Sequence, residues 1–409
     1  MGIKLGYFVP EFPGQTHIFF WRELERLEAL GAKVDIVSTR KPPLKISSHS
    51  WSDKAKARTI YLLGGELNFL LLLKLLGCAL QFSPLRWIHC LRSIQKSGLP
   101  LKGKVELLGL AFFGAALSLI AKDKGWDHLH VHSAANAANI ALFAKILSGL
   151  PYSLTLHGPL SDYGPNQKEK WSHADFGIVI TQKLFGEIRS ELGEAATKKL
   201  YIAPMGVNLQ VFKRKAPYEA YQGQGVGRIY CVGRLNPCKG HADLIRAVAL
   251  LRDKGQRVEL NIAGEDELGG SGYHLELQAL IDELNINREV KLLGAVSEQV
   301  IRDGLIESHL FALASLGEPL GVAIMEAMAL EMPVVVTSGG GVKELVDADQ
   351  DGVLVEAEDV ASISAGLEKV LNNPALANRL GSASRKKIAA QFQDSRSAEL
   401  LLKHAKKRL

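Results

Sequence analysis

The sequence predicts an α/β protein of two lobes, each built on a parallel sheet wrapped by helices. A length of 409 residues exceeds one typical domain and suits two hydrophobic cores. Strand-like apolar runs alternate with helix-like segments, which is typical of parallel sheets. The alternation stops near residue 204 and restarts near residue 228. In such folds, ligands bind beyond the carboxyl ends of the strands. We therefore expect the functional residues in the loops that follow the strands.

The first lobe is expected over residues 1–207 and the second over 208–387. In the first lobe the predicted strands and helices are 3–9, 17–30, 33–38, 129–132, 136–147, 152–156, 177–180 and 184–192. A break at 204–208 precedes the polar, glycine-bearing stretch 216–227, which is the best linker candidate. In the second lobe the predicted strands are 228–232, 258–263, 290–293, 310–314 and 333–336. The basic amphipathic segment 385–409 either caps the second lobe or, over about 388–409, packs back on the first.

Composition favours an ordered globular protein, since hydrophobic residues make up 47% of the chain and the formal net charge is only +6. The four cysteines show no CxxC spacing, so neither a disulfide framework nor a zinc site is expected. The N-terminus resembles a buried strand and lacks the features of a secretory signal. We therefore expect a cytoplasmic protein, and no nucleic-acid partner is indicated.

Residues 40–104 are strongly basic, with twelve lysines and arginines against two acidic residues, Asp53 and Glu66. They include the apolar run 67–80, which is shorter than the ~20 residues of a spanning helix and contains Lys74. One interpretation is a core or lobe-packing helix surrounded by solvated lysines. The other is a surface that rests on anionic lipid at the inner face of the plasma membrane.

Two cations, Arg234 and Lys239, follow the predicted strand 228–232 and precede a predicted helix. A helix start offers unpaired N–H groups and a positive dipole end, so added cations there predict a diphosphate site. Gly233 and Gly240 would let the backbone approach closely and turn tightly. The alternative is an ordinary basic loop.

A second segment carries Glu318 and Glu326, eight positions apart, with Pro319 suited to a first helical turn. On one helix their separation along the axis is at most ~12 Å, about the span from a donor sugar to a ribose. Each carboxylate can then accept hydrogen bonds from hydroxyl groups. The phosphate oxygens between them would bind N–H groups of Leu320, Gly321 and Val322. Two such glutamates more often form a solvated face, but apolar neighbours indicate that Glu326 is buried and needs a partner.

These two segments together resemble the retaining GT-B glycosyltransferases, the group 1 or Glu-x7-Glu family. The segments 205–208 and 340–344 match further landmarks of that family in order. The resemblance implies two Rossmann-like lobes whose parallel sheets face a central cleft. The stretch 12–16 with Glu23 more loosely resembles bacterial enzymes that assemble exopolysaccharide or capsule units on a lipid carrier.

The resemblance also implies roles for individual residues. Arg234 and Lys239 would neutralise the donor diphosphate, Glu318 would hold the donor sugar, and Glu326 would bind the ribose. Backbone near Val296 would border the base. Gly14 stands in the loop where family members often carry a glycine pair. His157, at the end of the strand 152–156, matches the histidine that faces the reacting sugar, although a lone histidine there is otherwise a structural hydrogen-bonding group.

His130 and His132 alternate along a strand and share a face, but the sequence shows no third metal ligand beside them. Because Arg234 and Lys239 supply the charge that a divalent ion would otherwise give, we expect no metal and no cofactor. The predicted reaction transfers a hexose from a UDP-sugar, with glucose the first choice and GDP-mannose the second donor to test. The acceptor would be a growing exopolysaccharide or a lipid-linked oligosaccharide, and UDP the product. A nucleotide-sugar epimerase on the same scaffold and a non-catalytic nucleotide-sugar binding protein remain alternatives.

Overall fold

The computed structural model describes residues 2–14, 17–42, 51–64, 68–193, 196, 199–266 and 272–407. The chain forms two compact units. Of the described residues, those up to Pro204 and those from Ser395 onward form the first unit, and Met205–Asp394 form the second. The main division thus falls between Pro204 and Met205, where the expected lobe boundary was 207.

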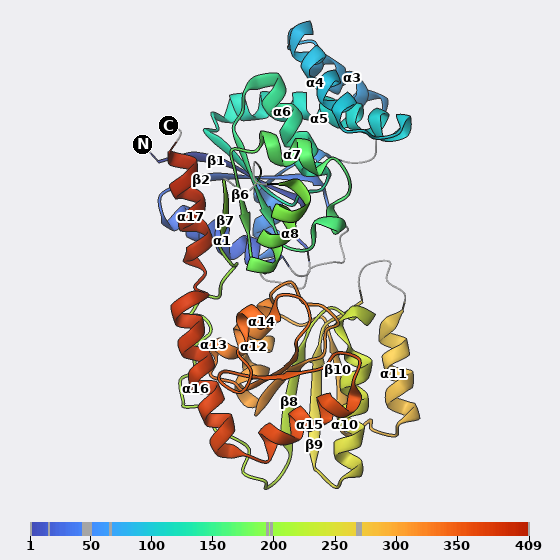
Figure 1. Cartoon of the computed structure of the whole chain (residues 1–409), viewed down its shortest axis with the longest axis vertical. Coiled ribbons are helices and arrows are strands. Elements are labelled where there is room, and N and C mark those ends of the chain that lie inside the picture. The colour runs from blue at the N-terminus through green and yellow to red at the C-terminus, as the bar shows by residue number, and fades with distance from the viewer. Residues whose placement is uncertain are drawn as a thin grey trace. The chain divides into compact units, whose positions relative to one another are not determined.

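The first unit contains a seven-stranded parallel sheet in the order β3-β2-β1-β4-β5-β6-β7 (Figure 1). Its strands are β1 (Lys4–Glu11), β2 (Lys33–Arg40), β3 (Thr59–Leu63), β4 (His128–His132), β5 (Tyr152–Leu156), β6 (Phe176–Val179) and β7 (Leu200–Ile202). The central strands β4, β5 and β6 are buried at every position, as strands covered on both faces must be. The two outermost strands, β3 and β7, were not predicted.

The second unit repeats this plan with six parallel strands in the order β10-β9-β8-β11-β12-β13. They are β8 (Gly227–Val232), β9 (Val258–Ala263), β10 (Val290–Gly294), β11 (Leu310–Leu313), β12 (Val334–Thr337) and β13 (Val353–Val355). The predicted α/β class and parallel sheets are confirmed in both units. The edge strand β13 was not predicted, because three residues carry too little periodicity.

Helices connect the strands of both sheets. In the first unit they are α1 (Ile18–Ala29), α2 (Ser52–Arg58), α3 (Phe69–Ala79), α4 (Pro84–Lys96), α5 (Leu101–Lys124), α6 (Asn136–Ser148), η1 (Leu160–Tyr163), α7 (Gln167–His173) and α8 (Gln182–Leu192). In the second they are η2 (Pro237–Lys239), α10 (His241–Asp253), α11 (Tyr273–Glu283), α12 (Glu298–Glu307), α13 (Val322–Ala329), α14 (Val342–Leu345) and α15 (Val360–Leu371).

The C-terminal segment packs on both units, which combines the two alternatives that its sequence left open. Helix α16 (Pro374–Gln391) packs on α13 in the second unit, whereas α17 (Ser395–Lys406) packs on α1 in the first. The stretch 216–227 lies inside the second unit, where the Tyr218 hydroxyl donates to the His309 carbonyl oxygen at 2.5 Å. Its interpretation as a linker was therefore wrong, because a polar surface loop has the same composition as a linker.

Candidate active site

Both sheets change strand order at one point, and polar loops leave the second sheet there. In the second unit this point lies between β8 and β11, which are hydrogen-bonded neighbours although β9 and β10 separate them in the chain. The loops after these strands, 233–240 and 314–321, are joined by a hydrogen bond from the Leu316 N–H to the Cys238 carbonyl oxygen at 2.8 Å. Such a topological switch point is where open α/β sheets bind ligands.

Lys239 and Glu318, 79 positions apart in the chain, meet at this switch point. The Lys239 Nζ forms an ion pair with Glu318 Oε2, and the Ser315 hydroxyl donates to the same oxygen at 3.2 Å. Both charged side chains are largely covered, with 16% and 13% of their areas exposed. The arrangement holds one cation and one carboxylate at the same place, where each could exchange its partner for a ligand group.

The helix that follows begins later than its sequence predicts. Helix α13 starts at Val322, and Gly321 before it has a φ of 99°. Glu318 and Pro319 therefore precede the helix, and the Glu318 carbonyl oxygen accepts from the Gly341 N–H at 2.8 Å. The estimate of a helical separation between Glu318 and Glu326 was wrong, because a left-handed glycine separates them.

The remaining residues of this segment are covered to different degrees. Glu326 lies in the second turn of α13 and is 7% exposed, which agrees with its apolar neighbours. Leu320 is buried, while Val322 is partly exposed as the first residue of α13. Gly321 therefore supplies the turn that connects the loop 314–321 to α13. The first N–H groups of α13 have no partner within the helix and lie at the end of that loop.

The two glycines that flank Arg234 and Lys239 differ in what they permit. Gly240 has a φ of 64°, and a Cβ on it would lie 2.0 Å from the Ala314 carbonyl oxygen, so only glycine fits. Beside Gly233 the nearest heavy atom to such a Cβ is 3.5 Å away. A Cβ is thus excluded at Gly240 and not at Gly233, whose own carbonyl oxygen would lie 1.8 Å from a Cβ on Gly264. Arg234 follows Gly233 directly and is partly exposed.

His241 is a buried residue of this region that the sequence interpretation missed. It is the first residue of α10, is fully buried, and forms no hydrogen bond through either ring nitrogen within the described part of the chain. Burial, and secondarily the charge of Lys239, lowers its pKa to about 4. Its place directly after Lys239-Gly240 was the available signal. Val296 lies between β10 and α12 and is partly exposed.

In the first unit, His157 ends a chain of buried polar groups. It follows β5, and its Nε2 lies 3.1 Å from His132 Nδ1, while His132 Nε2 lies 3.0 Å from Glu23 Oε2. The Tyr7 hydroxyl donates to the same Glu23 oxygen at 2.7 Å. The contact between His132 Nε2 and Glu23 lacks hydrogen-bond geometry, so this nitrogen has no hydrogen-bond partner within the described residues. The hydrogen bond between His132 Nδ1 and His157 Nε2 engages one ring nitrogen of His157 and leaves its Nδ1 outside this chain of contacts.

The pKa of His157 shows that this imidazole is neutral near pH 7. Burial, and secondarily the neighbouring His132, lowers the pKa of His157 to about 3. Burial also lowers the pKa of His130 and of His132 well below the ordinary value. His157 is therefore suited to hydrogen bonding with a hydroxyl group, and not to donating a proton as an imidazolium.

A third potential metal ligand does stand beside His130 and His132, contrary to the sequence interpretation. Glu23, from α1, has an oxygen that lies with nitrogens of both histidines inside a 4.8 Å cluster. The His130 nitrogens already contact the hydroxyl groups of Ser153 and Thr155 at 2.7 and 2.9 Å. His132 Nε2, by contrast, lies 3.0 Å from Glu23 Oε2 without hydrogen-bond geometry, so the polar atoms of the cluster are only partly satisfied.

The loop that contains Gly14 lies close to His157 through α1. The His17 N–H donates to the Gly14 carbonyl oxygen at 3.1 Å, and a Cβ on Gly14 would lie 2.7 Å from the His17 ring. Gln15 and Thr16, which belong to the predicted 12–16 motif, lie outside the described residues. Phe20, one turn into α1, packs edge-on against His157 with ring centroids 5.2 Å apart. Gly14 and His157 thus belong to the same unit and are connected through His17 and Phe20.

A pocket of about 750 Å³ opens at the carboxyl edge of the first sheet, and the sequence did not predict it. Residues that end β1 and β2, that begin α5 and α6, and that follow β5 line it. Its polar side chains include Arg40, Lys102, Glu106, Asn136 and Tyr163. Two of these are already oriented, because Asn136 Nδ2 donates to Glu106 Oε1 at 3.1 Å and Arg40 pairs with Glu11.

Residues 223–387, most of the second unit, match the family described as glycosyl transferases group 1. The proposed colanic acid biosynthesis glycosyltransferase WcaL of Escherichia coli is 25% identical over 383 residues, 89% of this chain and 90% of WcaL. The proposed glycosyltransferase EpsD of Bacillus subtilis is 28% identical over 240 residues, 56% of this chain and 61% of EpsD. The chain thus spans nearly all of one relative and under two thirds of the other.

The fold of the whole chain also matches a solved structure. HepE of Anabaena, solved with UDP and glucose, superposes with a TM-score of 0.74, and the match covers 100% of both chains at 16% identity. At that identity the likeness concerns the fold alone. It agrees with the two parallel-sheet units and identifies their common architecture as GT-B.

Proposed function

We propose that the chain is a group 1 glycosyltransferase on a GT-B scaffold, which transfers a hexose from a UDP-sugar with retention of anomeric configuration. The acceptor is a growing exopolysaccharide or a lipid-linked oligosaccharide. The observation that carries the proposal is the pairing of Lys239 with Glu318 at the switch point of the donor sheet. HepE, whose solved complex contains UDP and glucose, and WcaL, named for colanic acid biosynthesis, support the choice of donor and of polymer.

The donor diphosphate is proposed to bind between the loops 233–240 and 314–321. As the bond from the sugar C1 to the diphosphate oxygen breaks, negative charge grows on the leaving phosphate. Arg234, Lys239 and the N–H groups at the start of α13 stabilise that charge. Glu318, released from Lys239, accepts hydrogen bonds from the sugar hydroxyls, and Glu326 does so from the ribose. A bond from the acceptor oxygen to C1 forms on the same face, and the acceptor proton passes to a leaving phosphate oxygen.

His157 is proposed to orient the reacting sugar through its Nδ1. The hydrogen bond between His157 Nε2 and His132 Nδ1 holds the ring, and the depressed pKa keeps it neutral, as needed for accepting a hydroxyl hydrogen bond. Charge stabilisation by Arg234 and Lys239 makes a metal ion unnecessary, so the transfer is proposed to be metal-independent. The unpaired state of all four cysteines, Cys78, Cys90, Cys231 and Cys238, supports a reducing, cytoplasmic setting.

The pocket of the first unit is proposed to take the acceptor saccharide. Its mixture of cationic, carboxylate and amide groups suits hydroxyl-rich ligands, which need donors and acceptors together. The pocket also lies at the carboxyl edge of its sheet, where ligands of such folds bind.

A two-step experiment tests the proposal. Thermal unfolding is first measured with UDP-glucose, other UDP-hexoses and GDP-mannose, because a ligand stabilises the folded protein as its concentration exceeds its Kd. Release of UDP in the presence of a saccharide acceptor is then followed with wild-type protein and with Glu318→Ala. A shift without turnover would favour a non-catalytic binding protein, and conversion of the free sugar nucleotide would favour an epimerase. No shift with any of these donors would refute the proposal.

A further inference from the structure

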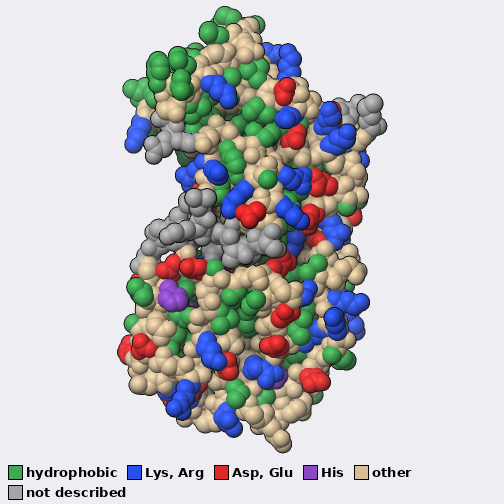
Figure 2. All heavy atoms as spheres, turned by 180° about the vertical axis from the view of Figure 1, so that it is seen from behind, with side chains coloured by type: hydrophobic (Ala, Val, Ile, Leu, Met, Phe, Trp, Pro, Cys, Tyr) green, Lys and Arg blue, Asp and Glu red, His purple; other side chains and the backbone are tan. Residues whose placement is uncertain are grey.

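Helices α3 and α4 and the first turn of α5 expose an unusual number of large hydrophobic side chains. Leu80, Leu70 and Phe69 are 85%, 74% and 72% exposed. We call the whole set the apolar hairpin surface: Phe69, Leu70, Leu72, Leu73, Leu76, Leu80, Leu85, Ile88, Leu91, Leu101 and Val105. Figure 2 shows hydrophobic side chains gathered over this hairpin. Contiguous apolar patches of this kind mark interaction sites.

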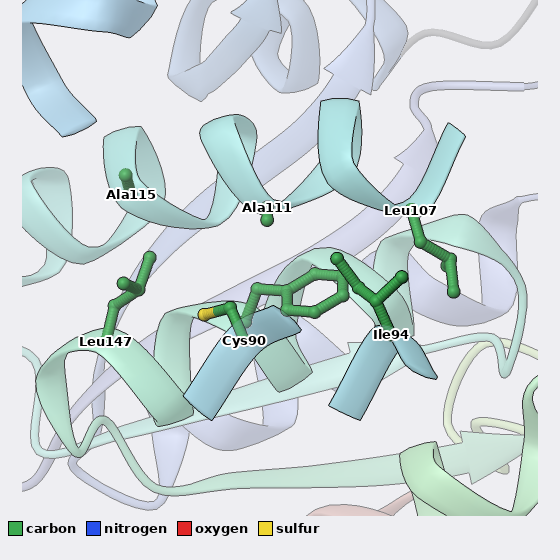
Figure 3. Packing of buried hydrophobic residues seen from close by; sticks show 7 residues of the cluster. Cys90, Ile94, Leu107, Ala111, Ala115 and Leu147 are labelled. Carbon is green, nitrogen blue, oxygen red and sulfur yellow. The ribbon is translucent and has the colours of Figure 1, made fainter. Parts of the chain in front are cut away.

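The inner side of the hairpin packs against α5 and α6, and this packing does not involve the outward-facing leucines. Cys90 and Ile94 of α4 meet Leu107 and Ala111 of α5 in one buried cluster, which also includes Phe143 of α6 (Figure 3). A side-chain hydrogen bond also joins the two short helices, since Trp87 Nε1 donates to the Ala79 carbonyl oxygen at 3.1 Å. The exposed residues belong to the opposite face, where no described element covers them.

The exposed positions follow the periodicity of the helices. Leu85, Ile88 and Leu91 are spaced three residues apart along α4, and Leu101 and Val105 are four apart on α5, so each set lies on one face. An apolar outer face on a helix whose inner face is already packed is typical of helices that lie in a membrane interface.

The charge of this segment indicates which kind of partner the apolar hairpin surface binds. Residues 68–105 contain six basic residues and no acidic one. The exposed members are Lys74, Arg86, Arg92, Lys96 and Lys102. A second copy of this surface would bring like charges together, whereas an anionic lipid headgroup layer attracts them.

We infer that α3, α4 and the first turn of α5 dock on an anionic lipid bilayer, with the helices lying in the headgroup region and not crossing it. Helices of 11 and 13 residues are too short to span a bilayer, and together they are bent by 112°. Helix α5, with 24 residues, has the length and apolarity of a span. However, it packs closely on α6, since a Cβ on Gly114 would lie 2.8 Å from Phe143 Cβ.

The docking surface adjoins the pocket described above. Leu99, Pro100 and Lys102, in the link from α4 into α5, also line that pocket. Docking would therefore place one wall of the pocket beside the headgroups. This adjacency, which rests on the proposed transfer reaction, favours an acceptor saccharide carried on a lipid over a free one.

Vesicle co-sedimentation of the full chain tests the inference without any activity measurement. Wild-type protein is mixed with vesicles of equal parts phosphatidylcholine and phosphatidylglycerol, or of phosphatidylcholine alone. We expect tighter binding to the anionic vesicles, and weakening by salt, because exposed charges are screened. In the double variant Leu70→Gln/Leu85→Gln, each substitution should weaken binding about tenfold on either vesicle. In Lys74→Gln/Arg92→Gln, each should weaken binding about fivefold on anionic vesicles only.

Two matched controls stand on the second unit. Leu275, which is 73% exposed, is changed to Gln, and the exposed Lys386 is changed to Gln; both variants should bind vesicles as the wild type does. Failure of wild-type protein to bind either vesicle, or full binding by the leucine variant, would overturn the inference. A wild-type dimer in sedimentation velocity that the leucine variant abolishes would instead assign the surface to a second copy. Thermal shifts with UDP-hexose, measured on the same variants, keep this outcome separate from the proposed function.

Discussion

Changing Glu318 to Gln should separate binding of the nucleotide from use of the sugar. Before donor binds, Lys239 Nζ is paired with Glu318, so a diphosphate must replace the carboxylate as the partner of that cation. A pair with this limited exposure contributes about 1 kcal/mol, so its removal should tighten UDP binding about fivefold. The side chain keeps its size, and the Ser315 hydroxyl keeps an oxygen to donate to.

The same substitution should impair transfer. A hydrogen bond to a charged group contributes about 1.5–3 kcal/mol, so loss of the carboxylate that holds the sugar should lower kcat/KM about 10- to 100-fold. UDP affinity is measured by titration calorimetry, and turnover by UDP release with the donor that shifts the melting temperature most. Glu318→Gln is thus expected to bind the product better and use the donor worse.

Glu368→Gln is the matched control, because it removes another lysine–glutamate ion pair of the same unit, with Lys254 Nζ at 2.5 Å. It should leave both UDP affinity and kcat/KM unchanged. Weaker UDP binding by Glu318→Gln, or turnover equal to that of the wild type, would refute the exchange of partners at Lys239.

Four further outcomes are expected. His157→Asn should lower kcat/KM about tenfold while UDP affinity stays constant, because it removes one hydrogen bond to the sugar; weaker UDP binding would contradict this role. Gly240→Ala should lower stability to urea by about 2 kcal/mol or more, since the residue has a positive φ and no room for a Cβ; unchanged stability would count against the loop geometry. The pKa values of His157 and His241, about 3 and 4, lie below the ordinary 6.5, so the unfolded chain binds protons first as the pH falls. The free energy of unfolding is therefore fully retained above pH 6.5 and declines below it, by about 2 kcal/mol for each histidine at pH 5. Urea unfolding at several pH values measures this decline. A free energy of unfolding that does not change with pH would refute the burial of the two histidines as neutral groups. EDTA should leave turnover unchanged. Loss of turnover in EDTA would instead indicate a bound metal ion, for which the cluster around Glu23 is the candidate site.

The sequence alone determined the fold class and singled out the segments that we propose to bind the donor, because both depend on local patterns. Alternating buried strands and amphipathic helices can form only a covered parallel sheet, whichever neighbours each strand acquires. Arg234 stands out because it closely follows an apolar strand, and Glu326 because it lies within an apolar helix, while Lys239 and Glu318 are charged residues of the loops that follow β8 and β11. Edge strands β3 and β7 escaped prediction, because short strands at the edge of a sheet carry little periodicity.

Only the tertiary structure decided which groups meet. The strand order places β8 beside β11, and this long-range choice pairs Lys239 with Glu318. Likewise β1 lies beside β4, which brings Glu23 of the following helix to His132 and thereby fixes His157. Side-chain contacts across a hundred residues depend on the packing of whole elements, which no local spacing records. The same holds for the apolar hairpin: its composition was visible in the sequence, but which leucines face the core and which face outward was decided by packing on α5 and α6.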